Sequence, residues 1–167
     1  AGANSMGAAD LDADDNADLI VAVPFGVVFL WSQGDGTFTP LETLPLGSNP
    51  VVVEAADLDR DGDLDLATAN TLYSGSTDNA SVLLNEGGRV FAWPRNYGVG
   101  SGLPRLAVAD FDGDGAQDLA VANLGTRDIS LLRNKGDGDF AMAVKSQLPA
   151  GAGALTSAHP GEKDGAE

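Results

Sequence analysis

Short apolar runs alternate with acidic and glycine-rich segments along the chain, and the same order of segments recurs. The runs DLIVAV from Asp18, DLATAN from Asp65 and DLAVAN from Asp118 are β-branched or small and apolar, which favours short buried strands. Each is followed by a second apolar run and a glycine-rich turn that suits a tight hairpin. The pattern predicts antiparallel strands rather than amphipathic helices.

Each repeat is expected to contain four strands. One precedes the acidic segment, one follows it, the third ends at the glycine-rich turn, and the fourth leads through a Gly/Pro-marked connection to the next repeat. Four strands in about fifty residues is the size of one β-propeller blade. We therefore predict an all-β fold of tandem four-stranded antiparallel β-propeller-type blades, with about three and a third repeats in a single array. The predicted boundaries are 1–47, 48–100 and 101–150 for the blades and 151–167 for a partial, degenerate fourth repeat.

The acidic segment of each repeat is a candidate metal-binding loop. ADLDADDNADLIVAV begins at Ala9, ADLDRDGDLDLATAN at Ala56 and ADFDGDGAQDLAVAN at Ala109, so aspartates recur at the first, third, fifth and ninth loop positions. Ca²⁺ takes six to eight oxygen ligands, and alternate side chains of a tight loop can converge on one ion. We predict about three Ca²⁺ per chain. The candidate ligands are Asp10, Asp12, Asp14, Asn16 and Asp18; Asp57, Asp59, Asp61, Asp63 and Asp65; and Asp110, Asp112, Asp114, Ala116 and Asp118, where the seventh-position residues Asn16, Asp63 and Ala116 would offer a main-chain carbonyl.

The sixth loop position must reverse the backbone. Gly62 and Gly115 occupy it in the second and third loops, where a positive φ costs glycine little. Asp15 occupies it in the first loop, and a left-handed conformation is less favourable for aspartate. We expect the first loop to bind its ion more weakly.

Two alternatives to this kind of site make different demands on the sequence. A calcium site between two helices needs a glutamate at the twelfth loop position, where Val21, Thr68 and Val121 stand. A solvated acidic turn would contain aspartate and glycine by composition alone, but it would not require the same four positions in three copies. The repetition favours a metal site.

The acidic loop, the DLAVAN strand and the hairpin SLLRNKGDGDF together resemble FG-GAP/VCBS-type repeats, the blades of integrin-α-like β-propellers and of many secreted bacterial proteins. The resemblance covers nearly the whole chain. In that family the loop between the first two strands of a blade binds Ca²⁺, which implies the aspartates named above as ligands. The last copy, AHPGEKDGAE, departs from the pattern, because Pro160, Glu162 and Asp164 stand where the first three aspartates belong, and no site is assigned to it.

Composition limits the possible binding partners and the expected cellular location. With 25 acidic and 9 basic residues the net charge is −16, which argues against a nucleic-acid partner. The chain has no cysteine, and calcium can replace disulfides as a stabilising link outside the cell, so we expect an extracellular protein, secreted or at the cell surface. The longest apolar run, residues 19–31, is too short to span a bilayer and is interrupted by Pro24. Because the chain begins at Ala1, we expect a processed product whose signal lies outside it.

Few residues suggest catalysis or ligand binding. The one histidine is His159, there is no cysteine nucleophile, and the carboxylates are assigned to the loops, so no enzyme activity is expected. Trp31 and Trp93 are expected to pack within blades; the alternative is a platform on which sugars stack. The sequon Asn79-Ala80-Ser81 is taken as a weak marker of the surface.

The repeat number sets the expected assembly and function. Propellers close with typically four to eight blades, so three and a third repeats cannot close alone. The chain would complete a ring with a second copy, stack into a filament, or form part of a larger propeller. The main hypothesis is a structural or adhesive, calcium-stabilised repeat protein that associates with itself. The alternative is a carbohydrate-binding propeller module or the non-catalytic part of a secreted enzyme.

Overall fold

A computed structural model describes residues 2–40, 43–71 and 78–148, and in this part the chain forms strands and no helix. It therefore offers no helix that could cross a membrane within these residues. The partial repeat at 151–167, with His159, Pro160, Glu162 and Asp164, lies outside the described residues. The strands are β1 (Ser5–Ala9), β2 (Asp18–Val23), β3 (Gly26–Ser32), β4 (Phe38–Pro40), β5 (Leu44–Pro45), β6 (Asn49–Ala56), β7 (Asp65–Thr71), β8 (Asn79–Leu83), β9 (Arg95–Gly98), β10 (Arg105–Ala109), β11 (Asp118–Asn123), β12 (Asp128–Leu132) and β13 (Val144–Gln147).

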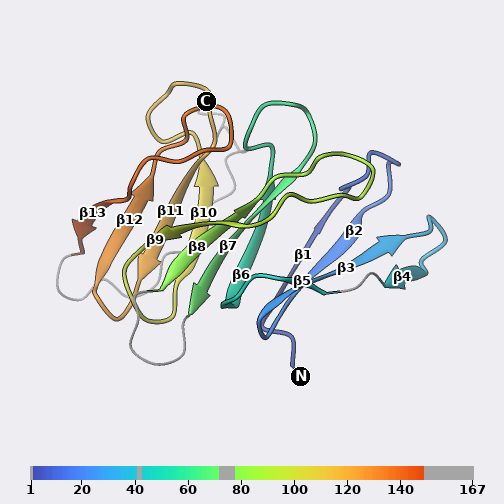
Figure 1. Cartoon of the computed structure of the whole chain (residues 1–167), viewed down its shortest axis with the longest axis horizontal. Helices are drawn as coiled ribbons and strands as arrows, with labels where there is room; N and C mark the ends of the chain where they lie inside the picture. Colours follow the sequence, from blue (N-terminus) through green and yellow to red (C-terminus); the bar gives the residue numbers. More distant parts are fainter. Residues whose placement is uncertain (1, 41–42, 72–77, 149–167) are drawn as a thin grey trace, which may run out of the picture.

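The strands form three antiparallel sheets that stand side by side (Figure 1). In chain order they are β1-β2-β3-β4, β6-β7-β8-β9 and β10-β11-β12-β13, here called blades 1, 2 and 3. None of the sheets closes on itself, and the prediction of tandem four-stranded blades is confirmed. Blade 1 differs in one respect: β5 adds a second pairing to β3, at the end opposite β4. Pro40 and Pro45 lie in β4 and β5, and proline has no N–H to donate to a ladder.

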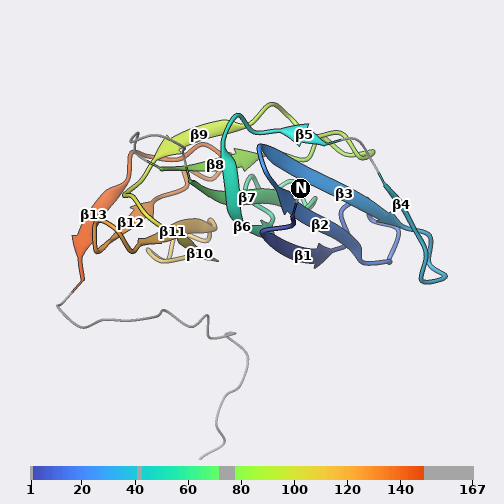
Figure 2. The ribbon, with the colours of Figure 1, turned by 90° about the horizontal axis from the view of Figure 1, so that it is seen from below.

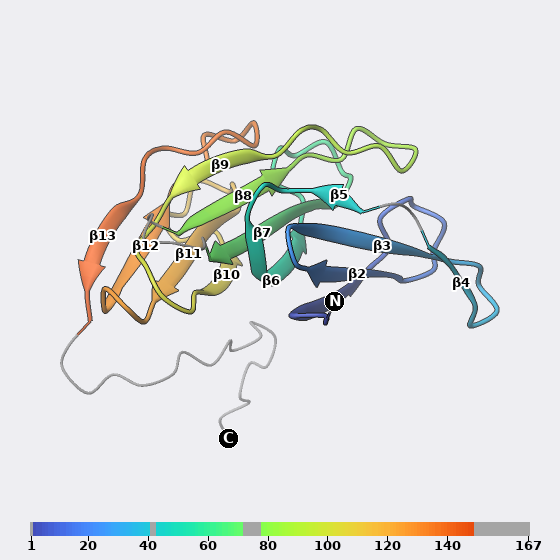
Figure 3. The ribbon, with the colours of Figure 1, turned by 60° about the horizontal axis from the view of Figure 1, so that its bottom comes forward.

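The repeats share one register. Ala9 pairs with Asp18, Ala56 with Asp65 and Ala109 with Asp118, so the ninth loop position opens the second strand of every blade. The first strands contact one another in turn, β1 with β6 and β6 with β10. Figure 2 shows the blades as an arc, with β1 and β10 on its inner side and β4, β9 and β13 on its outer side; Figure 3 shows the same order from another angle. This is the strand order of propeller blades.

Alternate side chains of each second strand face opposite neighbours. We call the face of a blade that turns toward the next blade in sequence its forward face, and the opposite face its rear face. One buried cluster joins the forward face of blade 1, including Ile20 and Phe29, to the rear face of blade 2, including Leu66. A second cluster joins Ala67 of blade 2 to Leu119 of blade 3. Blade 2 is therefore covered on both faces, whereas the rear face of blade 1 and the forward face of blade 3 have no blade against them in the described chain.

The structure separates the two tryptophans. Trp31 is fully buried and stacks on Phe29, with ring centroids 5.6 Å apart, so its predicted packing role is confirmed. Trp93 is 80% exposed, so the same prediction for it was wrong. Trp93 lies between the hairpin and β9, outside any strand ladder, where alternation does not fix the side of a residue.

Two further expectations can be compared with the strands. The apolar run 19–31 forms β2 and β3 joined by a turn, as predicted. The sequon does not mark an open surface: Asn79 opens β8, is half-buried, and its Oδ1 accepts a hydrogen bond from Asn70 Nδ2 at 2.6 Å. Ser81 is fully buried.

Candidate metal centre

The three acidic loops, 10–17, 57–64 and 110–117, each link the first strand of a blade to its second, and they lie at the same edge of the three sheets (Figure 1). The sixth position has a positive φ in all three loops, including Asp15, as predicted. The fourth position is left-handed as well. Comparison of the three repeats did not reveal this, because the residue at that position differs in each copy. The φ values at the fourth and sixth positions are 58° at Ala13 and 66° at Asp15, 67° at Arg60 and 96° at Gly62, and 81° at Gly113 and 87° at Gly115.

The first-position aspartates hold this reversal in place by accepting hydrogen bonds from main-chain amides of their own loop. In loop 1 the Asp15 amide lies 2.9 Å from Asp10 Oδ2, and in loop 3 the Gly115 amide lies 2.9 Å from Asp110 Oδ2. The Gly115 amide is the main cause that lowers the pKa of Asp110 below its usual range. Asp57 Oδ2 accepts the same bond from Gly62 at 3.3 Å. The first carboxylate thus fixes the conformation of its own loop.

The fifth-position aspartates close the far end of each loop. Each accepts a hydrogen bond at Oδ1 from the main-chain amide of the seventh residue, so this residue is tied to the loop whatever its side chain. The donor and acceptor pairs are Asn16 and Asp14 at 2.8 Å, Asp63 and Asp61 at 2.9 Å, and Ala116 and Asp114 at 2.7 Å.

The ninth-position aspartates are fully buried and anchor the loop to the blade. Each accepts one amide from the second loop residue and one from a residue at the end of the third strand or two positions past it. Burial raises the pKa of Asp65 to about 6 and raises that of Asp18, while these amide bonds oppose the shift. The distances are 3.1 Å from Leu11 and 2.8 Å from Ser32 to Asp18, 2.7 Å from Leu58 and 2.7 Å from Asn85 to Asp65, and 3.1 Å from Phe111 and 2.8 Å from Asn134 to Asp118.

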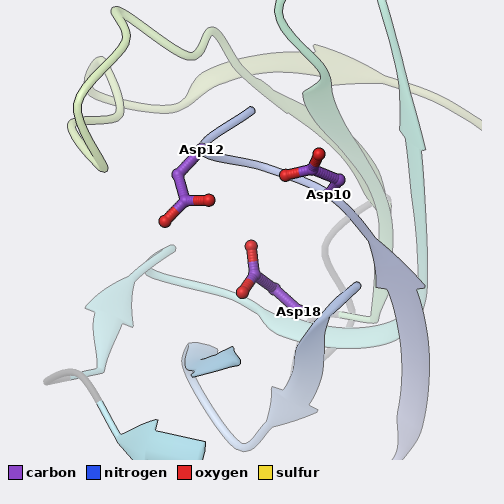
Figure 4. A group of neighbouring side chains, drawn as sticks. All are labelled: Asp10, Asp12 and Asp18. Atoms are coloured by element: carbon purple, nitrogen blue, oxygen red, sulfur yellow. The ribbon is translucent and has the colours of Figure 1, made fainter. Parts of the chain in front are cut away.

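The carboxylates converge in threes. Within the described residues, three groups have one carboxylate oxygen from each member within 4.8 Å of the others. Figure 4 shows the first group, in which the side chains of Asp10, Asp12 and Asp18 point toward one another. Asp14, Asp114 and Asp65, which were predicted as ligands, lie outside the groups. The groups are Asp10, Asp12 and Asp18; Asp57, Asp59 and Asp61; and Asp110, Asp112 and Asp118.

Asp12 carries the clearest sign that a ligand belongs in loop 1. Its side chain is only 8% exposed, and its Oδ1 is buried and has no hydrogen-bond partner among the described residues. A buried carboxylate oxygen without a partner is costly, and the neighbouring carboxylates add like-charge repulsion. A bound cation would remove both costs. In loop 2, burial and the neighbouring Asp61 carboxylate raise the pKa of Asp59. The loops therefore fit a hard cation, and these acidic clusters could hold metal ions.

Two asparagines link the blades beneath the loops. Comparison of the three repeats did not identify them. Asn85 of blade 2 donates from Nδ2 to the main-chain oxygen of Leu11 in loop 1, at 2.8 Å. Asn134 of blade 3 donates to the main-chain oxygen of Leu58 in loop 2, at 2.6 Å. Each asparagine stands two residues before the first glycine of its hairpin, a recurrence visible in the sequence, but its partner lies in another repeat.

The architecture and the loops define a tandem-repeat protein with propeller-like blades. The sequence model of the FG-GAP-like repeat matches residues 10–68 and 110–165, and the chain belongs to this family. A sequence comparison with curated proteins gave no significant match.

Two solved structures share the fold. An Agrocybe aegerita lectin, described as recognising non-reducing terminal N-acetylglucosamine, is 21% identical with a TM-score of 0.56; the alignment covers 84% of this chain and 37% of the lectin. The Tc holotoxin pore of Photorhabdus luminescens is 24% identical with a TM-score of 0.51; the alignment covers 87% of this chain and 7% of the toxin chain. The chain thus spans a minor part of each of these proteins.

Proposed function

We propose that this chain is a calcium-stabilised blade module of a secreted or cell-surface protein, with a structural role and no catalytic activity. The observation that carries the proposal is the buried, unpaired Oδ1 of Asp12 at the meeting point of Asp10 and Asp18. The candidate ligand atoms of these three residues are carboxylate oxygens, which suit hard cations. Ca²⁺ tolerates irregular sets of oxygen ligands better than Mg²⁺ does. Calcium outside the cell is abundant enough to fill such sites.

Calcium titration of the purified chain tests this proposal. Calorimetry should show bound Ca²⁺, and thermal unfolding should shift upward with Ca²⁺ because a ligand of the native state stabilises it by mass action. Asp12→Asn should remove one bound ion. Asp137→Asn is the matched control: Asp137 lies in the blade 3 hairpin and accepts the amide of Asp139 at 3.1 Å, so it should leave the ion count unchanged. Equal melting temperatures in Ca²⁺ and in chelator would contradict the proposal.

The forward face of blade 3 supports association with a further blade. Phe111 occupies the second loop position, where Leu11 and Leu58 are 3% and 0% exposed beneath the following blade, yet Phe111 is 48% exposed. A cavity of about 500 Å³ opens on this face, with Phe111, Ala120 and Leu131 among its lining residues. The occupant we propose is blade 1 of a second copy.

The rear face of blade 1 is suited to be that occupant. Val21, Val28 and Leu30 lie on it, apolar and half-buried, at the positions that in blades 2 and 3 pack against the preceding blade. Burying two apolar faces at opposite ends of the chain would build rings or filaments. Calcium should favour this by neutralising part of the −16 charge.

Light scattering after gel filtration tests the association. The chain should form dimers or larger species in Ca²⁺, and Leu131→Glu should return it to the monomer mass. Leu124→Glu is the control, because Leu124 is exposed in the turn between β11 and β12 and does not line the cavity. A wild-type monomer with and without Ca²⁺ would refute self-association and favour a blade segment of a longer propeller.

Glycan binding is the second candidate, favoured by the exposure of Trp93. An exposed indole offers an apolar face on which a sugar ring can stack. The related fold of the N-acetylglucosamine-recognising lectin makes terminal N-acetylglucosamine a suitable first probe. Trp93→Ala should abolish binding on a glycan array, whereas Met142→Ala, at the equivalent exposed position of blade 3, should not. Binding that is unchanged in Trp93→Ala, or no binding at all, would remove this candidate.

A further inference from the structure

Arg89 reaches from the hairpin of blade 2 into the acidic loop of blade 1. Its Nε donates to Asp12 Oδ2 at 2.6 Å, and its Nη2 lies 2.5 Å from the same oxygen. The Cζ atom of the guanidinium stands 4.8 Å from the centre of the buried Trp31 ring, within the range of a cation–π contact. One arginine therefore contacts both a candidate ligand of loop 1 and the core of blade 1.

Glycine occupies the position of Arg89 in the other two hairpins. Counted from the first hairpin glycine, Arg89 corresponds to Gly36 and Gly138. All three have a positive φ, with values of 68°, 85° and 68° respectively, a conformation that is uncommon for arginine. Strain of this kind at one copy of a repeat calls for a functional reason.

At the equivalent contact between blades 2 and 3, the side chain of Leu84 fills this space and would have to move to admit a side chain at Gly138. A Cβ atom added to Gly138 would lie 2.6 Å from Cδ2 of Leu84, which holds the place of Trp31, and 3.3 Å from Cβ of Asp59, which holds the place of Asp12. Loop 2 therefore receives no arginine from the next hairpin. The contacts of Arg60 with Asp114 and of Arg133 with Asp112, at 3.6 and 3.7 Å, are looser and join exposed or half-exposed groups.

We propose that Arg89 is a built-in cation that regulates loop 1: it occupies one oxygen of Asp12, lowers the affinity of the loop for Ca²⁺, and holds blades 1 and 2 together when the ion is absent. This inference rests on the proposed calcium function. An ion on Oδ1 and a guanidinium on Oδ2 of one carboxylate are like charges a few ångströms apart, so each weakens the binding of the other. Because coupling between two sites is reciprocal, filling loop 1 also loosens Arg89 from blade 1. Loop 2 receives no such arginine from the next hairpin, and the arginine contacts of loop 3 with Asp112 and Asp114 are longer.

The test uses Trp31 as a local reporter. The chain has two tryptophans, so a Trp93→Phe parent leaves Trp31 as the only tryptophan, beside Arg89. Trp31 emission is followed through a Ca²⁺ titration, and calorimetry counts the bound ions. Three variants of this parent are compared: Arg89→Met, which keeps the apolar stem without the charge; Arg89→Lys, which keeps the charge; and Arg95→Met, which makes the same change in net charge at an exposed residue of β9.

Arg89→Met should lower the Ca²⁺ midpoint at Trp31 roughly tenfold, within the usual range of coupling between sites. Arg89→Lys and Arg95→Met should stay near the parent. In chelator, Arg89→Met should melt below Arg95→Met, because the contact between blades 1 and 2 is lost.

If the parent binds calcium and the Ca²⁺ midpoint of Arg89→Met is equal to or higher than that of the parent, the inference is overturned and the proposed function stands. Equal tightening by Arg89→Lys would also overturn it, since the charge would then not be the cause. A parent that binds no calcium by calorimetry would refute the proposed function, and this inference with it.

Discussion

Asn134 Nδ2 lies 2.6 Å from the main-chain oxygen of Leu58, a residue 76 positions earlier in the chain. The same amide group donates to Gln117 at 2.9 Å, while Asn134 Oδ1 accepts from Gly136 at 2.9 Å. One buried side chain therefore joins its own hairpin, its own acidic loop and the acidic loop of the preceding blade. Blade packing and loop conformation are coupled through this residue.

Asn134→Ala should strongly destabilise the chain. It leaves the buried carbonyl oxygen of Leu58 and the half-buried one of Gln117 without their donor. A lost bond to a buried group costs about 1–3 kcal/mol, so we expect a fall of about 2–4 kcal/mol in the free energy of unfolding. Ser32 holds the equivalent position in blade 1, and Ser32→Ala should cost less than about 1 kcal/mol. Urea denaturation measures both. Similar losses for the two variants would show that the bond between blades contributes little.

The loop aspartates should differ in how much stability they contribute when calcium is removed. Asp118→Asn should lower stability in chelator by about 1–3 kcal/mol, because the buried carboxylate accepts amides from Phe111 and Asn134. Asp112→Asn should change stability in chelator by no more than about 0.5 kcal/mol, the usual range for a surface substitution, but should reduce the stabilisation gained from Ca²⁺. Thermal melts of both variants in Ca²⁺ and in chelator make the comparison. A large effect of Asp112→Asn in chelator would contradict this division.

The repeat pattern was sufficient to predict the strands, because alternation and turn residues are local signals. Ile20 and Leu66 could be placed in strands from neighbours along the chain alone. Whether the Trp93 side chain faces the core or the solvent could not be inferred, because Trp93 lies outside the strand ladders and no pairing fixes its direction. The link from Asn134 to Leu58 was also beyond the sequence pattern, because it depends on how one blade packs on the next.

The acidic loops were only partly predictable, because the sequence pattern carries local signals alone. Recurrence of the aspartates located each loop and its left-handed sixth position. It predicted Asp18 as a ligand, but it could not show that Asp14 turns to the amide of Asn16 and lies outside the cluster, because this depends on side-chain direction within one loop. Nor could it show Arg89, whose partner is Asp12 in another blade.

The contact between Tyr97 and Asp139 should make the junction of blades 2 and 3 sensitive to acid. Tyr97 donates to Asp139 Oδ1 at 3.0 Å, and hydrogen bonds from Lys135 and then Tyr97 hold the pKa of Asp139 below its usual range. A lowered folded-state pKa stabilises the native chain above the unfolded value of 3.8, and this contribution is lost as the pH falls through the folded value. Tyr97→Phe should therefore lower the melting temperature by a few degrees at pH 7 and by less near pH 3. Asp137→Asn, in the same hairpin, is the control, and a loss for Tyr97→Phe that is independent of pH would argue that only packing is affected.

Asp15 should limit loop 1 independently of Arg89. Its φ of 66° is one that glycine adopts in the other two loops, and the left-handed region costs a non-glycine residue about 1 kcal/mol. Asp15→Gly removes this strain and one negative charge that makes no contact with the converging carboxylates, so it should raise the melting temperature in chelator. The reciprocal change, Gly115→Asp, should lower it by a similar amount at loop 3. Differential scanning calorimetry of both variants, with Ala13→Gly as a second relief of a positive φ in loop 1, measures the effect. If Asp15→Gly is no more stable than wild type while Ala13→Gly is, the Asp15 side chain contributes a compensating contact and the conformational argument fails at that position.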